Sequence, residues 1–356
     1  MNKNKVLMSG NEAIAEGAIQ AGCRFYAGYP ITPQNEIPSY MSVHMPKARG
    51  VFIQAESELA AINMLYGAAA TGARAMTSSS SPGISLKQEG ISYIAGAELP
   101  AVIVNISRGG PGLGNIAPSQ SDYFQSVRGG GHGDYRLIVL APSSVQEAYD
   151  FTSLAFTLAD KYRIPAMILG DGMLAQMMEP IVCRKPQVGS HKFKKPWALT
   201  GCKGRKSNIV KSFYLKEGDL ERANLHLQEK YKIIEKKEQR CEELFIDDAE
   251  VLLVSYGSMS RIAKSAIERL RGEGMKVGML RPISLWPFPK DIFCRVARAG
   301  KCKRVLVVEM SYGQMVDDVR LALDCRLPVD FFGRAGGGIP SEEEIIKKIK
   351  ESKTRS

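Results

Sequence analysis

The sequence predicts an α/β protein with two doubly wound domains, each built on a mainly parallel sheet. Short apolar runs, typical of strands that are buried on both faces, alternate with longer segments in which apolar residues recur at helical spacing. This alternation occurs over residues 1–180 and again over residues 249–356, and residues 181–248 interrupt it. With 356 residues, the chain is long enough for two such cores.

The first domain is predicted to begin with a strand and to alternate from there. Its expected strands are Val6–Ser9, Arg24–Tyr29, Val51–Gln54, Arg74–Ser78, Pro100–Ile106, Arg136–Leu140 and Ile164–Leu169. Its expected helices are Asn11–Ala21, Pro33–Met45, Glu58–Thr71 and Val145–Asp160. Another helix is expected to follow Ser81 as its N-cap, with Pro82 in the first turn. Helices between the strands predict a parallel sheet that is covered on both faces.

Residues 181–248 are predicted to form a linker. No acidic residue occurs from Pro180 to Lys216, and lysines and arginines there account for much of the net charge of +11. This concentration argues against a nucleic-acid-binding fold. It fits docking to an acidic partner, binding of a phosphorylated ligand, or solubility alone. In Asp219–Leu244, apolar side chains and one thiol recur every seven positions at Leu220, Leu227, Ile234 and Cys241, which predicts an amphipathic helix lying on another surface.

The second domain repeats the alternation of strands and helices. Its expected strands are Val251–Tyr256, Lys276–Leu280, Arg304–Glu309 and Pro328–Phe332. Its expected helices are Ser258–Gly272, Asp291–Ala299, Gln314–Leu323 and Ser341–Lys350.

Composition excludes several classes of protein. No apolar run approaches the ~18 residues of a membrane span, and the N-terminus lacks a signal-peptide pattern, so we expect a cytoplasmic protein with no membrane partner. The seven cysteines are scattered and never form a Cys-x-x-Cys pair. This pattern argues against a disulfide framework, a zinc site or an iron–sulfur cluster held by this chain alone, and no metal site is expected.

Three predicted strand ends in the first domain carry polar side chains. Thr32 lies between two prolines, Glu56 and Glu58 lie at a strand-to-helix junction, and Arg108 precedes a glycine-rich loop. In open α/β sheets, ligands bind beyond the carboxyl ends of the strands. A hydroxyl, a carboxyl and a guanidinium gathered there would suit binding and activation of a small carboxylate substrate.

Each of these residues also has an ordinary structural interpretation. Thr32 would cap a helix, the two glutamates would complement a helix dipole, and Arg108 would be a surface residue on a flexible loop. The helix that follows Glu58 favours a site role for that residue. Its many alanines and Gly67 allow close packing and burial of the helix, and a carboxyl at the head of a buried helix is not a solvated cap.

Two glycine motifs do not carry the chemistry that they suggest. The glycines at 110, 112 and 114 lack the spacing of a dinucleotide-binding loop. Gly170–Gly172 resembles the start of the Mg²⁺–diphosphate motif of thiamine-diphosphate enzymes, but Lys195–Thr200 contains no asparagine where that motif requires a pair. The chain is therefore not expected to hold the diphosphate.

Five motifs in order resemble the alpha-type subunit of the 2-oxoacid:ferredoxin oxidoreductases, in the subgroup that oxidises 2-oxoisovalerate (3-methyl-2-oxobutanoate). The motifs are Gly28–Pro33, Gln54–Glu58, Thr77–Gly83, Ser107–Gly112 and Leu280–Pro289. The resemblance implies that residues 1–180 form a pyrimidine-binding domain of the thiamine-diphosphate fold. Residues 249–356 would form a transketolase C-terminal-like domain.

The resemblance also implies cofactors and partners. This chain would contact only the pyrimidine end of thiamine diphosphate, and a beta-type subunit would hold the diphosphate and Mg²⁺. The [4Fe-4S] clusters would lie on a ferredoxin-like delta subunit and on the beta subunit, with a gamma-type subunit completing the complex. Ferredoxin and coenzyme A would be co-substrates in the oxidative decarboxylation of a 2-oxoacid to acyl-CoA and CO₂. The chain would be inactive alone, and a homodimer is compatible with this scheme.

By the same resemblance, the site residues acquire roles. Glu58 is the first candidate to contact the ring nitrogen of the aminopyrimidine and share its proton, and Glu56 is the second. Thr32 matches the position that hydrogen-bonds the substrate. Arg108 matches the position that pairs with its carboxylate, for which the guanidinium fork is suited.

Two other functions stay open on the sequence. One is the beta chain of a lipoamide-linked branched-chain 2-oxoacid dehydrogenase, although that chain would lack the Tyr29–Pro33 motif. The other is a non-catalytic scaffold subunit whose working surface is the basic linker. No residue in the sequence selects a branched substrate side chain over a methyl group or a second carboxylate.

Overall fold

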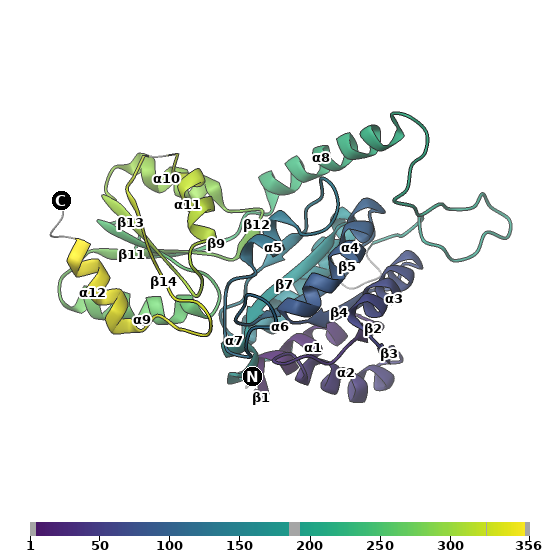
Figure 1. Cartoon of the computed structure of the whole chain (residues 1–356), viewed down its shortest axis with the longest axis horizontal. Coiled ribbons are helices and arrows are strands. Elements are labelled where there is room, and N and C mark those ends of the chain that lie inside the picture. Colours follow the sequence, from purple (N-terminus) through teal and green to yellow (C-terminus); the bar gives the residue numbers. More distant parts are fainter. Residues whose placement is uncertain (1–4, 185–192, 325, 353–356) are drawn as a thin grey trace.

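The computed structural model describes residues 5–184, 193–324 and 326–352. Two α/β units lie side by side, each with its own sheet, as Figure 1 shows. Both sheets consist mainly of parallel strands, which confirms the predicted fold class. In the described part of the chain, no helix is both long and apolar enough to cross a membrane.

The larger sheet contains seven strands. Their order is β12 (Ser284–Trp286), β6 (Ile138–Leu140), β7 (Pro165–Asp171), β5 (Ala101–Ser107), β4 (Ala75–Ser79), β2 (Phe25–Gly28) and β3 (Val51–Gln54). β12 alone among these strands pairs antiparallel with its neighbour, β6. The helices of this unit are α1 (Gly10–Gln20), α2 (Glu36–Lys47), α3 (Glu58–Ala70), α4 (Ser81–Gly96), α5 (Tyr123–Arg128), α6 (Val145–Tyr162) and α7 (Gly172–Gln176).

The smaller sheet contains five strands. Their order is β14 (Val329–Gly333), β13 (Arg304–Glu309), β10 (Val251–Val254), β11 (Val277–Pro282) and β9 (Cys241–Leu244). Its helices are α9 (Met259–Gly272), α10 (Lys290–Ala299), α11 (Met315–Leu323) and α12 (Glu342–Ser352). A separate antiparallel pair joins β1 (Val6–Ser9) to β8 (Met178–Ile181).

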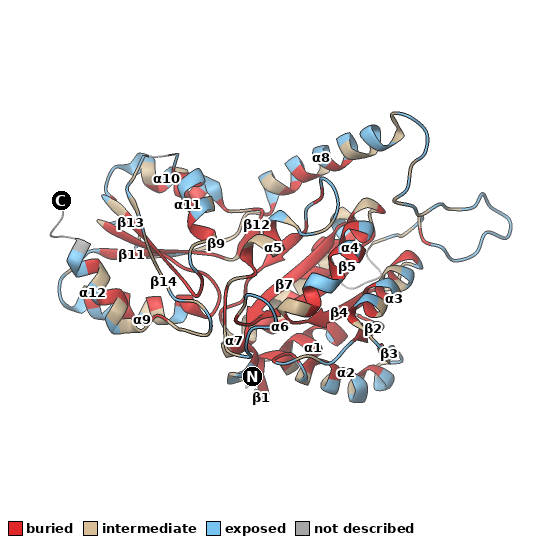
Figure 2. Ribbon diagram, in the orientation of Figure 1, coloured by how far each residue is buried: buried red, intermediate tan, exposed pale blue. Residues whose placement is uncertain are grey.

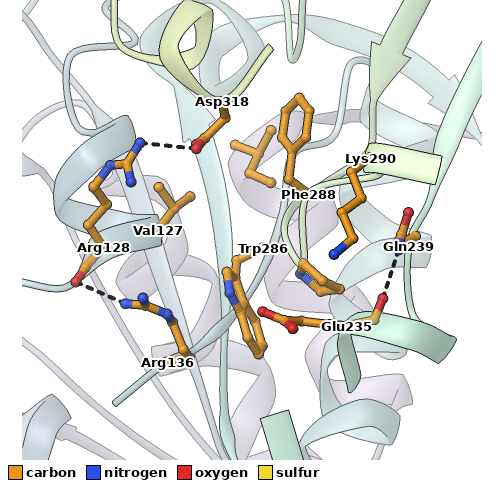
Figure 3. A pocket seen from close by; sticks show the side chains of 11 residues that line it. Val127, Arg128, Arg136, Glu235, Gln239, Trp286, Phe288, Lys290 and Asp318 are labelled. Carbon is orange, nitrogen blue, oxygen red and sulfur yellow. Dashed lines mark hydrogen bonds and ion pairs between the residues drawn. The ribbon is translucent and has the colours of Figure 1, made fainter. Parts of the chain in front are cut away.

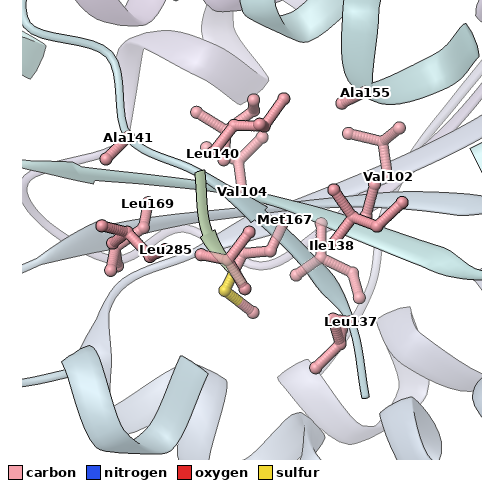
Figure 4. Packing of buried hydrophobic residues seen from close by; sticks show 14 of the residues in the cluster. Val102, Val104, Leu137, Ile138, Leu140, Ala141, Ala155, Met167, Leu169 and Leu285 are labelled. Carbon is pink, nitrogen blue, oxygen red and sulfur yellow. The ribbon is translucent and has the colours of Figure 1, made fainter. Parts of the chain in front are cut away.

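The core lies on the central strands of the larger sheet. Every residue of β4, β5 and β7 is buried, which explains why these strands read as continuous runs rather than alternating ones (Figure 2). In Figure 4, Val104 of β5 and Leu140 of β6 lie on one face of the sheet and Met167 of β7 lies on the other, and Leu285 of β12 is buried in the same core. Fully burying each such side chain contributes roughly 1.5–3 kcal/mol. β12 therefore attaches the later part of the chain to the larger sheet, through its pairing with β6 and the burial of Leu285.

Local sequence signals explain where several helices begin. Ser9 and Glu12 form a capping box at the head of α1, with Glu12 N donating to Ser9 Oγ at 3.2 Å and Ser9 N donating to Glu12 Oε2 at 2.9 Å. Ser144 caps α6 by accepting a hydrogen bond from the backbone N–H of Glu147. The cap of α4 is Ser80, one residue earlier than predicted.

Two predicted helices differ in extent from the structure. The helix expected from Pro33 begins at Glu36, with Asn35 as its N-cap residue. The helix expected over 219–244 is α8 (Asp219–Lys237), and Cys241 lies on β9 instead. A seven-residue repeat does not register where a helix ends, and β9 exists because β11 offers it an edge. Residues 193–218, which include the later part of the basic segment, contain no helix or strand. Lys195 and Leu199 contact the body through Asp160 and Ala70, and the chain beyond them projects from the body in Figure 1.

Candidate functional site

Polar side chains gather around the first turn of α4, at the carboxyl end of β4. Glu58 begins α3, and its side chain is buried, with 6% of the residue exposed. Ser57 caps α3 by accepting a hydrogen bond from Ala60 N at 3.1 Å. Glu56 is exposed. The structure therefore separates the two glutamates, and only Glu58 faces the interior.

Glu58 has no hydrogen-bonded partner among the described residues, although it is buried. It faces Gly83 in the first turn of α4, where a Cβ atom would lie 2.5 Å from Glu58 Oε1. The same Cβ would collide with the Oγ atom of Ser79, a buried hydroxyl that also lacks a partner. A carboxylate without a hydrogen bond from the described residues and a buried hydroxyl without a partner, both beside a glycine, are suited to a polar ligand.

Lys87, one helical turn beyond Gly83, is a site residue that the sequence analysis missed. It is fully buried, and its Nζ donates to Thr77 Oγ1 of β4 at 2.7 Å. Burial lowers the pKa of Lys87 to about 7, and the negative charge of Glu58 opposes that shift. A lysine at the spacing of Ile84 and Ile91, on the buried stripe of α4, was the available signal.

The structure brings Arg108 and Thr32 together. Arg108 Nη1 donates to the Thr32 carbonyl oxygen at 2.9 Å, and Nη2 donates to the Leu113 carbonyl oxygen at 2.9 Å. Arg108 is buried, not a surface residue, and its Nε is left without a partner. Thr32 is exposed and is not the cap of α2; its Oγ1 accepts a hydrogen bond from Asn35 Nδ2 at 3.3 Å.

The first turn of α4 connects Arg108 to the Glu58 side of the site. Ser81 Oγ accepts a hydrogen bond from Arg108 N at 3.0 Å and donates to Asp122 Oδ2 at 2.6 Å. Asn105 Nδ2 donates to the same Asp122 oxygen at 2.8 Å. Burial raises the pKa of Asp122. Sequence analysis missed Asp122 because it belongs to a loop far along the chain from its partners.

Asp171, in the Gly170–Gly172 segment, has a structural role. Its Oδ1 accepts hydrogen bonds from Met173 N at 2.9 Å and Leu174 N at 3.2 Å, which caps α7. Its Oδ2 accepts from Ser258 Oγ in the second unit. Both carboxylate oxygens are therefore used within the protein.

A cavity of about 210 Å³ lies elsewhere, between α5, α8, β12 and α10 (Figure 3). Arg136, Lys290 and Glu235 line it beside Trp286, and Arg128 on its wall pairs with Asp318 at 3.0 Å. None of the site residues predicted from the sequence lines this cavity. Within the described ranges, no group of three or more His, Cys, Asp or Glu side chains is arranged to hold a metal ion.

Comparison with known proteins gives the chain its family. Residues 16–244 match the family model "Pyruvate flavodoxin/ferredoxin oxidoreductase, thiamine diP-bdg", and residues 249–345 match "Pyruvate:ferredoxin oxidoreductase core domain II". The ketoisovalerate oxidoreductase subunit VorB of Methanothermobacter thermautotrophicus is 53% identical over 345 residues, which cover 97% of each chain. The 2-oxoglutarate synthase subunit KorA of Archaeoglobus fulgidus is 40% identical, over 92% of this chain and 94% of that one.

Solved structures agree with these matches. The 2-oxoglutarate:ferredoxin oxidoreductase from Magnetococcus marinus, solved with 2-oxoglutarate, coenzyme A and succinyl-CoA bound, superposes with a TM-score of 0.85 at 28% identity. The match covers 98% of this chain and 65% of that longer chain. A split-gene transketolase shares the fold, with a TM-score of 0.61 at 13% identity. The chain therefore belongs to the 2-oxoacid:ferredoxin oxidoreductase family, as a subunit of an oxidoreductase complex with a thiamine-diphosphate-binding domain.

Proposed function

We propose that the chain is the subunit that contributes the pyrimidine side of the active site in a complex oxidising 2-oxoisovalerate. The reaction is the coenzyme A-dependent oxidative decarboxylation of the 2-oxoacid to acyl-CoA and CO₂, with reduction of ferredoxin. The choice of 2-oxoisovalerate follows the relative that is 53% identical over nearly the full length of both chains. The observation that carries the site assignment is the buried Glu58 carboxylate, which has no hydrogen bond among the described residues.

The residues around Glu58 fit the pyrimidine end of thiamine diphosphate. An open carboxylate is an acceptor for a protonated ring nitrogen, and the unpartnered Ser79 hydroxyl lies beside the same glycine, Gly83. When bound, thiamine diphosphate supplies the nucleophilic carbon and takes up the electrons that decarboxylation leaves behind. Glu58 orients the ring and shares a proton with its nitrogen. Glu56, which is exposed, has no part in this contact.

Arg108 and Thr32 are assigned to the 2-oxoacid. The guanidinium of Arg108 is oriented by two backbone carbonyl oxygens, and its Nε is still free to donate. A positioned guanidinium binds a carboxylate through charge-assisted hydrogen bonds, which are stronger than neutral ones. The exposed Thr32 hydroxyl is close enough in the chain to the Arg108 contact to donate to the same substrate.

The remaining parts of the reaction are assigned to other subunits. A beta-type subunit is proposed to hold the diphosphate and Mg²⁺, and ferredoxin-like delta and gamma-type subunits are proposed to complete the complex. The [4Fe-4S] clusters belong to those partners in this scheme. The chain alone is then inactive.

The test is to express the chain alone and with its partner subunits, and to measure 2-oxoacid-dependent reduction of a viologen dye without oxygen. We expect activity only in the complex, with 2-oxoisovalerate preferred over pyruvate and 2-oxoglutarate. Glu58→Gln is expected to lower kcat by about 10²-fold or more, and Glu56→Gln is the matched control that leaves it unchanged. A scaffold subunit would tolerate both substitutions, so normal turnover by the Glu58→Gln complex overturns the assignment.

A further inference from the structure

Lys87 occupies a position where a charged side chain is costly. The residue is fully buried between α4 and the sheet, and Thr77 Oγ1 is its hydrogen-bond partner among the described residues. An ammonium group has three donors, and taking it out of water is expensive unless a charge compensates for it. Methionine has a similar length and would fill the same space without this cost. A lysine here calls for an electrostatic explanation.

Among the elements that pack around α4, Glu58 supplies the negative charge that compensates for the Lys87 ammonium group. Glu58 begins α3, which packs along α4, and its field acts on Lys87. The other acidic groups nearby have partners of their own. Asp122 accepts hydrogen bonds from Ser81 and Asn105, Asp171 accepts them from α7 and Ser258, and Glu89 on α4 itself accepts one from Tyr93. β5, which also contacts α4, carries no charged side chain.

Gly83 and Lys87 lie one turn apart on α4, so both face the same side of the helix. Gly83 is in contact with the Glu58 carboxylate. We propose that Lys87 is a positioning residue that acts through Glu58, its buried ammonium group attracting the carboxylate and holding it in place for the pyrimidine ring of the cofactor. This inference rests on the proposed role of Glu58 and deepens it.

The first test compares wild-type and Lys87→Met complexes across pH. Lys87 loses its proton as the pH rises through about 7, so its support of Glu58 is present at pH 6 and largely gone at pH 9. The ratio of wild-type to variant kcat is therefore expected to be about tenfold at pH 6 and to approach one at pH 9, with KM for the 2-oxoacid little changed. A lysine with a merely structural role would give the same ratio at every pH, and that result overturns the proposal.

Two variants keep this test decisive. Lys195→Met removes a lysine that pairs with the buried Asp160 at 2.6 Å, outside the site, and is expected to give a pH-independent ratio. If Lys87→Met does not fold, Thr77→Val removes the acceptor of Lys87 while keeping the side-chain shape. Its expected ratio is about threefold at pH 6 and one at pH 9. A ratio of one throughout overturns the proposal.

A second test needs no activity. The Lys87 amino group is titrated by nitrogen NMR in the cofactor-free complex, with and without Glu58→Gln. Loss of the Glu58 charge is expected to lower the pKa of Lys87 further, and an unchanged pKa overturns the proposal. Different results would contradict the proposed role of Glu58 and the proposed role of Lys87. Normal turnover by the Glu58→Gln complex removes the proposed function, whereas an inactive Glu58→Gln complex with a constant Lys87→Met ratio removes only this inference.

Discussion

The two α/β units each bury a glutamate at a strand–helix junction, and they treat it differently. Glu309, the last residue of β13, accepts hydrogen bonds from Met315 N and Val316 N at 3.0 Å each, and from Ser311 Oγ at 2.9 Å. It thereby caps α11. Glu58 in the first unit accepts none from the described residues. The Glu309 carboxylate is therefore fully hydrogen-bonded within the protein, whereas the Glu58 carboxylate can still accept hydrogen bonds from a ligand. This difference distinguishes a binding site from a helix cap.

The pH dependence of stability distinguishes the two units most sharply, because Lys87 lies in the first unit, near Glu58. Unfolded, Lys87 binds its proton up to pH 10.5; folded, it releases it near pH 7. Between these values the unfolded chain binds more protons, so this residue makes stability rise with pH. The cost is fully present below pH 7, on the order of 3–5 kcal/mol. Lys87→Met is therefore expected to stabilise the chain most at pH 6 and less at pH 9.

Denaturant unfolding of the isolated chain at several pH values measures this effect. Lys195→Met is the control, because it removes a lysine that lies outside the site and pairs with Asp160 at 2.6 Å. A Lys87→Met difference that does not change with pH would show that the buried lysine keeps an ordinary pKa.

Glu309→Gln tests the other half of the comparison. The amide would lose one acceptor oxygen and leave buried donors such as Met315 N without a partner, so we expect a loss of about 2 kcal/mol in the free energy of unfolding. The kcat of the folded complex should not change, because the carboxylate is used within its own unit. Unfolding curves and a viologen assay on the same preparation check both parts. A large fall in kcat with unchanged stability would reverse the roles given to Glu309 and Glu58.

The sequence predicted the sheets well because buried parallel strands have an unmistakable apolar pattern. The bounds of Arg304–Glu309, a mostly buried strand, were predicted without error, and so were those of Val51–Gln54, which is not buried. β12 was missed, since three residues carry no periodicity and its pairing with β6 joins parts of the chain far apart in sequence. β9 was missed for a similar reason, because it depends on the edge of β11.

The candidate site was predictable only in part. Glu58 stood out from Glu56 because the small residues of α3 predicted burial, and the structure places Glu58 inside. Lys87 had one signal in the sequence, its spacing from Ile84 and Ile91, but no local pattern shows that α3 and β4 close around it. Arg108 was singled out correctly as a strand-end residue. Its hydrogen bond to the Thr32 carbonyl oxygen depends on the geometry of a loop, which no local sequence pattern predicts.

The smallest expected effect comes from substitution of Gly83, whose lack of a side chain leaves room for the Glu58 carboxylate. In Gly83→Ala, the new methyl would lie 2.5 Å from Glu58 Oε1, so the carboxylate must move away from its present position. We expect kcat to fall about tenfold, together with a loss of about 1 kcal/mol in stability from overpacking. Gly67→Ala on α3 is the matched control, because nothing lies within 4 Å of its Cβ and alanine favours the helix by roughly 0.5–1 kcal/mol. If Gly83→Ala kept full activity, the Glu58 carboxylate would tolerate displacement, and the contrast with the tightly held Glu309 would lose its functional meaning.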